Sequence, residues 1–193
     1  LVINGIVTAQ DVDESKKLND LNSYSESIAF IGRLDEMRCI SEFMTAVELL
    51  SEADIISEVN VVGYATSNEL LKNLKKKISF LENKIKVNFY QSVPRDTVVR
   101  IIKQSTVCVS LVREERFLEK SFPSKLIELL LFDKAIVSQR VNDLQSLNNF
   151  IWIDNVEPGT IYKAACSALQ QEKNRSENPY NGRDWVLAQC SLD

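Results

Sequence analysis

The chain has 193 residues, with 23 lysines and arginines against 27 aspartates and glutamates, so its formal net charge is −4. This balance argues against a nucleic-acid-binding protein, because such proteins usually carry clustered excess positive charge. Hydrophobic residues make up 45% of the chain and charged residues 26%, as in an ordinary globular protein. We therefore expect one compact domain without nucleic-acid partners.

Three absences exclude whole classes of chemistry. The chain has no histidine, so it lacks Ser-His and Cys-His nucleophile pairs and His-ligated zinc. Its 5 glycines never adopt the spacing of a dinucleotide fingerprint or a P-loop. Its 4 cysteines form no CxxC pair, which favours free thiols in a reducing compartment. We expect neither a metal ion nor another cofactor.

The sequence predicts no membrane-spanning segment, because it has no apolar run of about 18 residues. Its first residues also lack the charged and apolar regions of a signal peptide. We expect a soluble, cytoplasmic protein. The chain does not begin with methionine, which suggests a segment of something longer.

Residues 1–26 differ in pattern from the rest. Four apolar residues near the start predict a short strand or an extended stretch: Val2, Ile3, Ile6 and Val7. Residues 11–27 are polar and show no clear period. We interpret 1–26 as a linker or N-terminal segment and 27–193 as the folded domain.

From about Ser27, a short apolar run followed by a helix-period segment recurs at intervals of roughly 25 to 30 residues. This alternation is typical of βαβ units and predicts a three-layer α/β/α fold around a mostly parallel six-stranded sheet. The predicted strands are Ile28–Ile31, Val59–Val62, Ile85–Tyr90, Val107–Leu111, Ala135–Ser138 and Phe150–Ile153.

Helices are predicted between these strands from apolar residues at helical spacing. In the second helix, four lysines lie largely off the apolar stripe, which we interpret as a solvated face rather than a nucleic-acid patch. Pro94 is expected at the first position of the third helix. The predicted helices begin near Ser41, span Asn68–Leu81, begin at Pro94, run from Pro123 to about Phe132 and from Thr160 to about Gln170, and surround Trp185.

Ligands of open parallel sheets bind beyond the carboxyl ends of the strands, so we searched those ends for charged groups. Arg33 and Arg38 follow the first strand. Two guanidiniums there could hold a diphosphate without a metal, because arginine offers planar donor pairs to phosphate oxygens. The alternative is two exposed arginines that pair with Asp35 and Glu36.

Glu128 is the second candidate, since it lies one turn into an otherwise apolar helix after the fourth strand. A carboxylate there could accept both hydroxyls of a ribose. The alternative is a glutamate that stabilises the helix dipole or pairs with a lysine. The charged cluster just upstream is interpreted either as a solvated loop or as an active-site loop, and it consists of Glu114, Glu115, Arg116, Glu119 and Lys120.

Four segments together resemble the C-terminal, donor-binding half of GT-B glycosyltransferases, most closely the retaining group 1 (family 4) enzymes that use nucleotide sugars. Val2-Ile-Asn-Gly-Ile6 also resembles the interdomain linker of that group. The segments are Ile28-Ala-Phe-Ile-Gly-Arg-Leu-Asp-Glu-Met-Arg38, Val59-Asn-Val-Val-Gly63, Val87-Asn-Phe-Tyr-Gln-Ser-Val-Pro94, and Phe122-Pro-Ser-Lys-Leu-Ile-Glu128 with Lys134-Ala-Ile-Val137.

The resemblance implies a Rossmann-like fold, a UDP- or GDP-linked sugar donor, and a glycan or lipid-linked acceptor bound by an N-terminal domain that this chain lacks. It further implies a bacterial enzyme that is peripheral to the inner membrane face. Arg33 and Arg38 would neutralise the diphosphate, and Glu128 would hold the ribose. The other implied donor-binding residues are Gly32, Gly63, Tyr90, Gln91, Ser124 and Lys125.

Several positions depart from the pattern of that group. Lys120 stands where a sugar-facing glutamate is common, so Glu119 is our candidate for that catalytic role, with Glu115 as its alternative. Gln91 and Asp133 replace usual glycines. These departures leave open a degenerate, non-catalytic module that acts as a scaffold or partner subunit. An epimerase of the same fold would lack its usual histidine here, and a receiver-like regulator would lack its phosphoacceptor aspartate.

Overall fold

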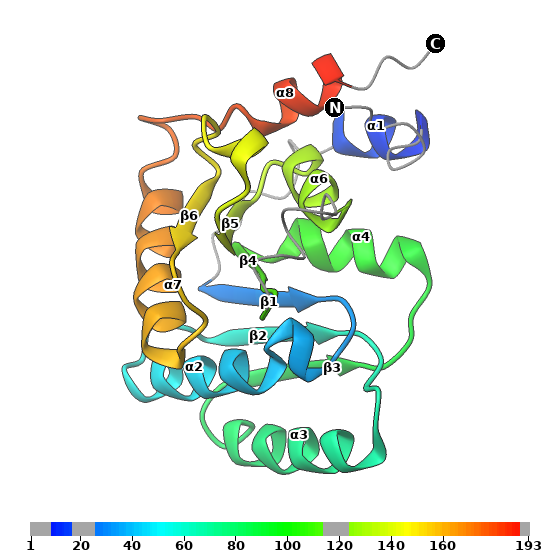
Figure 1. The fold of residues 1–193 in the computed structure, drawn as a ribbon, viewed down its shortest axis with the longest axis vertical. Coiled ribbons are helices and arrows are strands. Elements are labelled where there is room, and N and C mark those ends of the chain that lie inside the picture. Colours follow the sequence, from blue (N-terminus) through cyan, green and yellow to red (C-terminus); the bar gives the residue numbers. More distant parts are fainter. Residues whose placement is uncertain (1–8, 17–25, 114–123, 190–193) are drawn as a thin grey trace.

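Six strands form one parallel sheet in the order β3-β2-β1-β4-β5-β6, in a computed structural model that describes residues 9–16, 26–113 and 124–189 (Figure 1). The first strand is central, and β3 and β6 are the edges. The strands are β1 Ser27–Ile31, β2 Glu58–Val62, β3 Lys86–Tyr90, β4 Val107–Ser110, β5 Ala135–Gln139 and β6 Phe150–Ile153.

Helices cover both faces of the sheet, which confirms the three-layer fold (Figure 1). One face is covered by α2 Ile40–Glu52, α3 Asn68–Leu81 and α7 Pro158–Lys173. The other is covered by α1 Ala9–Lys16, α4 Arg95–Gln104, α6 Ser124–Leu131 and α8 Gly182–Gln189. Two short 3-10 helices, η2 Glu36–Arg38 and η3 Asn142–Leu144, follow β1 and β5.

Alternation along β1 explains the two-sided core. Ile28 and Phe30 lie in the apolar cluster under α2, α3 and α7, whereas Ala29 lies in the cluster under α4 and α6. All three side chains are buried. A central strand that is buried on both faces appears in the sequence as a continuous apolar run, and this run is the pattern from which β1 was predicted.

The predicted strands agree with the structure to within one residue at each end, and α3 matches its predicted bounds. Ser67 caps α3, because its Oγ accepts a hydrogen bond of 3.2 Å from the N–H of Leu70. Two helix starts were wrong. Pro94 lies just before α4 rather than in its first position, and α7 begins at Pro158 rather than Thr160.

Residues 9–16 form the helix α1, which the aperiodic polar pattern of residues 11–27 did not predict. Val12 of α1 is buried in the cluster under α4 and α6, and the Glu14 carboxylate lies 3.8 Å from the Lys103 ammonium. The segment AQDVDESK is mostly polar, so the sequence shows no helical period of apolar residues there. The predicted stretch over residues 2–7 lies outside the described residues.

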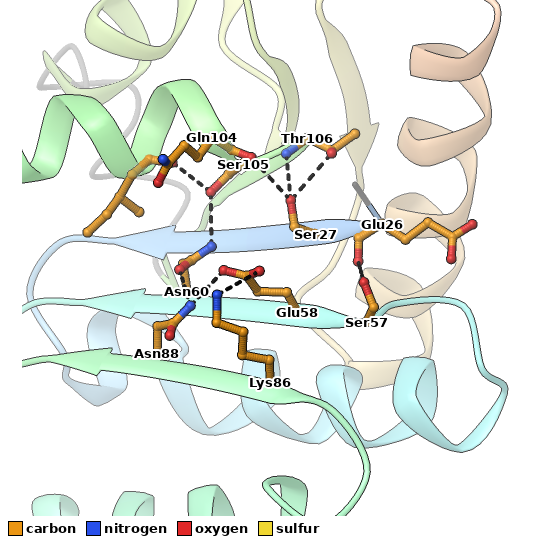
Figure 2. Close-up of polar contacts among 11 residues, drawn as sticks. Glu26, Ser27, Ser57, Glu58, Asn60, Lys86, Asn88, Gln104, Ser105 and Thr106 are labelled. Carbon is orange, nitrogen blue, oxygen red and sulfur yellow. Dashed lines mark hydrogen bonds and ion pairs between the residues drawn. The ribbon is translucent and has the colours of Figure 1, made fainter. Parts of the chain in front are cut away.

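A polar network crosses the sheet beneath the C-terminal end of α4 (Figure 2). The Asn88 amide donates to Asn60 at 2.9 Å, and the Asn60 amide donates to the Ser105 hydroxyl at 3.3 Å. Ser105 in turn donates to the Ile101 carbonyl at 2.8 Å. At the outer end Asn88 donates to the Glu58 carboxylate at 2.6 Å. The network satisfies buried polar groups that would otherwise destabilise the core.

Candidate functional site

The strand order reverses between β1 and β4. The chain passes from β1 to β2 and β3 on one side, and then crosses to β4, β5 and β6 on the other. Because all strands are parallel, their carboxyl ends lie along one edge of the sheet. The loops after β1 and β4 diverge there, which is where open α/β sheets bind ligands.

Gly32 and Gly63 bring the loops after β1 and β2 into close contact. The Gly32 N–H donates to the Val62 carbonyl at 2.9 Å, and the Gly63 N–H donates to the Tyr90 carbonyl at 2.8 Å. A Cβ atom on Gly63 would lie 1.7 Å from the Gly32 oxygen. Gly63 also has a φ of +157°, so only glycine fits this position.

The loop after β1 holds Arg33 and Arg38 in a defined shape. Arg33 pairs with the Asp35 carboxylate, and Asp35 Oδ1 also accepts a hydrogen bond of 2.9 Å from the N–H of Arg38. Cys39 then takes a left-handed conformation with a φ of 54°, and α2 begins at the next residue. The expected alternative pairing of Arg33 with Asp35 is therefore present.

Arg38 is partly buried, and its environment disfavours its charge. Burial lowers the pKa of the Arg38 guanidinium first, and the positive charge of Arg33 lowers it further. The side chain stays protonated at neutral pH, because free arginine has such a high pKa. Two neighbouring cations in this loop would be stabilised by an anion placed between them.

Glu128 is buried in the first turns of α6 and is held by two cations. Its Oε2 pairs with Lys125, and its Oε1 lies 3.3 Å from Nη1 of Arg95. The side chain is only 9% exposed. Oε1 makes no hydrogen bond among the described residues, so it keeps acceptor capacity. The alternative of a lysine-paired glutamate is thus present, and Oε1 is a buried acceptor whose hydrogen-bonding capacity is not filled by the described residues.

Arg95 also links the turn after β3 to α6. Tyr90 ends β3, Gln91 is exposed in the turn, and Arg95 is the first residue of α4. The contact between Arg95 and Glu128 brings this turn, which was expected to border the base, next to the glutamate expected to hold the ribose. Sequence reasoning missed Arg95. Its place directly after Pro94, at a helix start beside the crevice, was the available signal.

Two further polar residues, Arg113 and Gln139, make hydrogen bonds near the carboxyl ends of β4 and β5. The Gln139 amide bonds both backbone groups of Val112, accepting from its N–H at 3.2 Å and donating to its carbonyl. Arg113 bonds the loop after β1. Neither residue was singled out from the sequence, because the partners of each lie far away along the chain.

The remaining predicted residues divide into two groups. Ser124 is the exposed first residue of α6, and Lys125 lies beside Glu128. Glu119, Lys120 and Glu115 lie outside the described residues.

Among residues 9–16, 26–113 and 124–189, no group of three acidic, cysteine or histidine side chains could hold a metal ion. No helix in the same part of the chain is long and apolar enough to cross a bilayer.

Comparison with solved structures identifies the fold. The C-terminal domain of a glycosyl transferase group 1 family protein, LpcC of Francisella tularensis, is 13% identical, with full coverage of both chains and a TM-score of 0.69. HepE of Anabaena in complex with UDP is 15% identical, with a TM-score of 0.65 over 98% of this chain and 51% of that one. A second HepE structure, with UDP and glucose, is 14% identical, with a TM-score of 0.62 over 98% of this chain and 50% of that one.

This chain thus spans about half the length of HepE and the whole of the LpcC domain. The expected Rossmann-like GT-B C-terminal fold is confirmed. No curated protein matches the sequence. The profile of the family "Glycosyl transferases group 1", however, matches residues 11–185. Because that match covers most of the chain and all six strands, the chain belongs to the group 1 glycosyltransferase family.

Proposed function

We propose that this chain is the donor-binding half of a glycosyltransferase that takes a sugar from a nucleoside diphosphate and transfers it with retention at the anomeric carbon. One observation carries the proposal. Two neighbouring arginines after β1 and a buried glutamate after β4 flank the point where the strand order reverses.

The charges match the parts of such a donor. Arg33 and Arg38 offer donor groups to a diphosphate, and the N-terminus of α6 adds backbone N–H groups and a favourable dipole. Glu128 offers a carboxylate to the two ribose hydroxyls. HepE, which has the same fold, has been crystallised with UDP and with UDP and glucose, so UDP is the first nucleotide to test.

In the proposed reaction, the bond between the anomeric carbon and the terminal diphosphate oxygen breaks. The electron pair stays on the diphosphate, the oxygen of an acceptor hydroxyl forms the new bond on the same face of the sugar, and the hydroxyl proton passes to the leaving diphosphate. The two arginines stabilise the negative charge that develops on the leaving group. We place the acceptor, a glycan or lipid-linked sugar, on an N-terminal half outside this chain, so the isolated chain should bind the donor without transferring sugar.

A degenerate, non-catalytic module is the competing function. It is favoured by the contacts of Lys125 and Arg95 with Glu128, since these cations already engage the carboxylate. In a donor site, the ribose hydroxyls must share Glu128 with these cations. In a scaffold, the three side chains would only join α4 to α6.

Ligand-observed NMR of the isolated chain with UDP, GDP, ADP and CMP separates the two functions. We expect one nucleoside diphosphate to bind, and Arg33→Ala and Glu128→Gln each to weaken it by about tenfold, the value of one charge-assisted hydrogen bond. Arg100→Ala is the matched control, because Arg100 is exposed on α4. A folded chain that binds none of the four would favour the scaffold.

A further inference from the structure

Arg113 joins the end of β4 to the loop that carries Arg33 and Arg38. Its N–H donates to the Met37 carbonyl at 2.8 Å, and its Nε donates to the Glu36 carbonyl at 3.0 Å. Its Nη2 pairs with the carboxylate of Glu42 in the first turn of α2. One residue therefore fastens both η2, which contains Arg38, and the helix that follows it.

This loop needs such support. It turns through a 3-10 helix and then through Cys39, a non-glycine residue with a φ of 54°. A left-handed conformation costs about 1 to 2 kcal/mol for an L-residue, so the surrounding contacts must maintain it. Within the loop, the Asp35 carboxylate accepts from the N–H of Arg38 and pairs with Arg33, and the Cys39 N–H donates to the Glu36 carbonyl at 3.1 Å. From outside the loop, Arg113 Nε also donates to the Glu36 carbonyl, and the Arg113 N–H donates to the Met37 carbonyl.

The guanidinium of Arg113 is directed at protein groups. Its hydrogen bond with Glu42 raises the pKa of Arg113, so the cation is stabilised by a carboxylate of the protein itself. Arg33 is also paired with a carboxylate, that of Asp35. Arg113 differs because its Nε and its N–H bond two backbone carbonyls of the loop, so its contacts hold the loop itself.

We propose that Arg113 is a positioning residue that holds the loop of Arg33 and Arg38 in the shape that grips the donor diphosphate. This inference rests on the proposed function for its ligand. Its structural part, the fastening of the loop, is independent of any nucleotide. A substitution at Arg113 should therefore weaken binding of the phosphates and leave binding of the nucleoside almost unchanged.

The first test is amide hydrogen exchange of the free chain. Arg113→Ala removes the bond to Glu36 and the pair with Glu42, and keeps the backbone bond to Met37. We expect exchange of the Arg38 and Cys39 amides to accelerate about tenfold, as expected for the loss of a charge-assisted bond. Arg113→Lys, which can reach one of the two acceptors, should restore part of the protection. Arg100→Ala is the control and should leave both amides unchanged.

The second test is the ratio of affinities for UDP and uridine, measured by NMR titration. Arg113→Ala should weaken UDP about tenfold and leave uridine within about twofold, because uridine has no phosphate for the loop to grip. An equal loss for both ligands would overturn the positioning role, and so would unchanged exchange of the loop amides.

Two outcomes keep this inference separate from the proposed function. If the wild-type chain binds no UDP, the proposed function fails, while hydrogen exchange still decides whether Arg113 fastens the loop. If Arg113→Ala does not fold, Glu42→Gln replaces it, since that variant weakens the grip on the guanidinium without altering Arg113. Glu42→Gln should then accelerate exchange at Arg38 in the same direction, and unchanged exchange would refute the role.

Discussion

Gly63 shows how one missing side chain shapes the donor edge of the sheet. The loop after β2 can approach the loop after β1 only because position 63 has no Cβ, and the approach aligns both loops beside Arg33. The sequence contains only 5 glycines, and two of them, Gly32 and Gly63, directly follow β1 and β2. Their positions therefore indicate where the backbone of these loops requires glycine.

We expect Gly63→Ala to destabilise the protein by about 3 kcal/mol, because its Cβ would clash with backbone and its φ is unfavourable. Gly159→Ala is the control. Nothing lies within 4 Å of a Cβ at Gly159, which is the second residue of α7, and alanine is the better helix former. Urea denaturation of both variants measures the difference. A Gly63→Ala chain as stable as the wild type would contradict the close approach.

The buried thiols of Cys39 and Cys108 are a second residue-scale feature. Burial raises the pKa of Cys39 to about 11 and that of Cys108 to about 12. The reactive thiolate is therefore scarce near pH 8. We expect iodoacetamide at pH 8 to leave both residues unmodified in the native protein and to alkylate both in urea, as measured by peptide mass spectrometry. Rapid native modification of Cys108 would contradict its burial.

At the scale of the element, Lys134 provides hydrogen bonds to backbone carbonyls at the C-terminal end of α4. Its ammonium donates to the carbonyls of Lys103 at 2.8 Å and Ser105 at 2.9 Å. These carbonyls lie at the helix end, where a cation is favoured by the dipole. Burial lowers the pKa of Lys134, so the helix end and the two bonds offset the cost of placing this charge inside.

We expect Lys134→Met to destabilise the protein by about 2 kcal/mol, because it leaves two buried carbonyls without a donor. Lys163→Met is the matched control, since Lys163 is exposed on α7. Thermal unfolding followed by circular dichroism compares the two variants. Equal melting temperatures would show that water replaces the ammonium at this helix end.

At the scale of the whole molecule, the two apolar clusters share one sheet. Trp152 and Trp185 both pack on the cluster under α4 and α6, whereas Leu50 of α2 is buried in the other cluster. Fluorescence of the two tryptophans therefore reports on one face of the sheet, and far-ultraviolet circular dichroism reports on the whole.

We expect Leu50→Ala to lower the free energy of unfolding by about 3 kcal/mol through the cavity it leaves. The loss should be equal by fluorescence and by circular dichroism, because both clusters pack on the same strands and the chain should unfold in one cooperative transition. Separate midpoints for the two probes would show that the faces unfold independently.

The sequence predicted the strands because buried parallel strands are short apolar runs, and it predicted the site loops because strand ends follow from strand positions. It predicted local pairs, Arg33 with Asp35 and Glu128 with a lysine, but not the long-range partners of the site side chains. The pairs Arg95 with Glu128 and Arg113 with Glu42 join residues that are far apart in the chain. Side-chain directions set such pairs, and residue spacing does not encode them.

Asp133 and α1 show two other limits. Asp133 stands where a glycine was expected, and it adopts a left-handed φ of 57° while its carboxylate pairs with Arg175. A tertiary ion pair thus accompanies a backbone shape that local propensity would assign to glycine. In α1, the mostly polar segment AQDVDESK gave no apolar period that would signal a helix.

The polar outer end of the network in Figure 2 lies on the edge strand β3. β3 is an edge strand, and its Lys86 ammonium lies 3.2 Å from the Glu58 carboxylate, with Asn88 two residues further along. Edge strands offer unpaired backbone groups to other chains, and charged residues on them discourage sheet-to-sheet addition. We therefore expect the side chains that link β3 to β2 also to discourage edge-to-edge pairing with another chain.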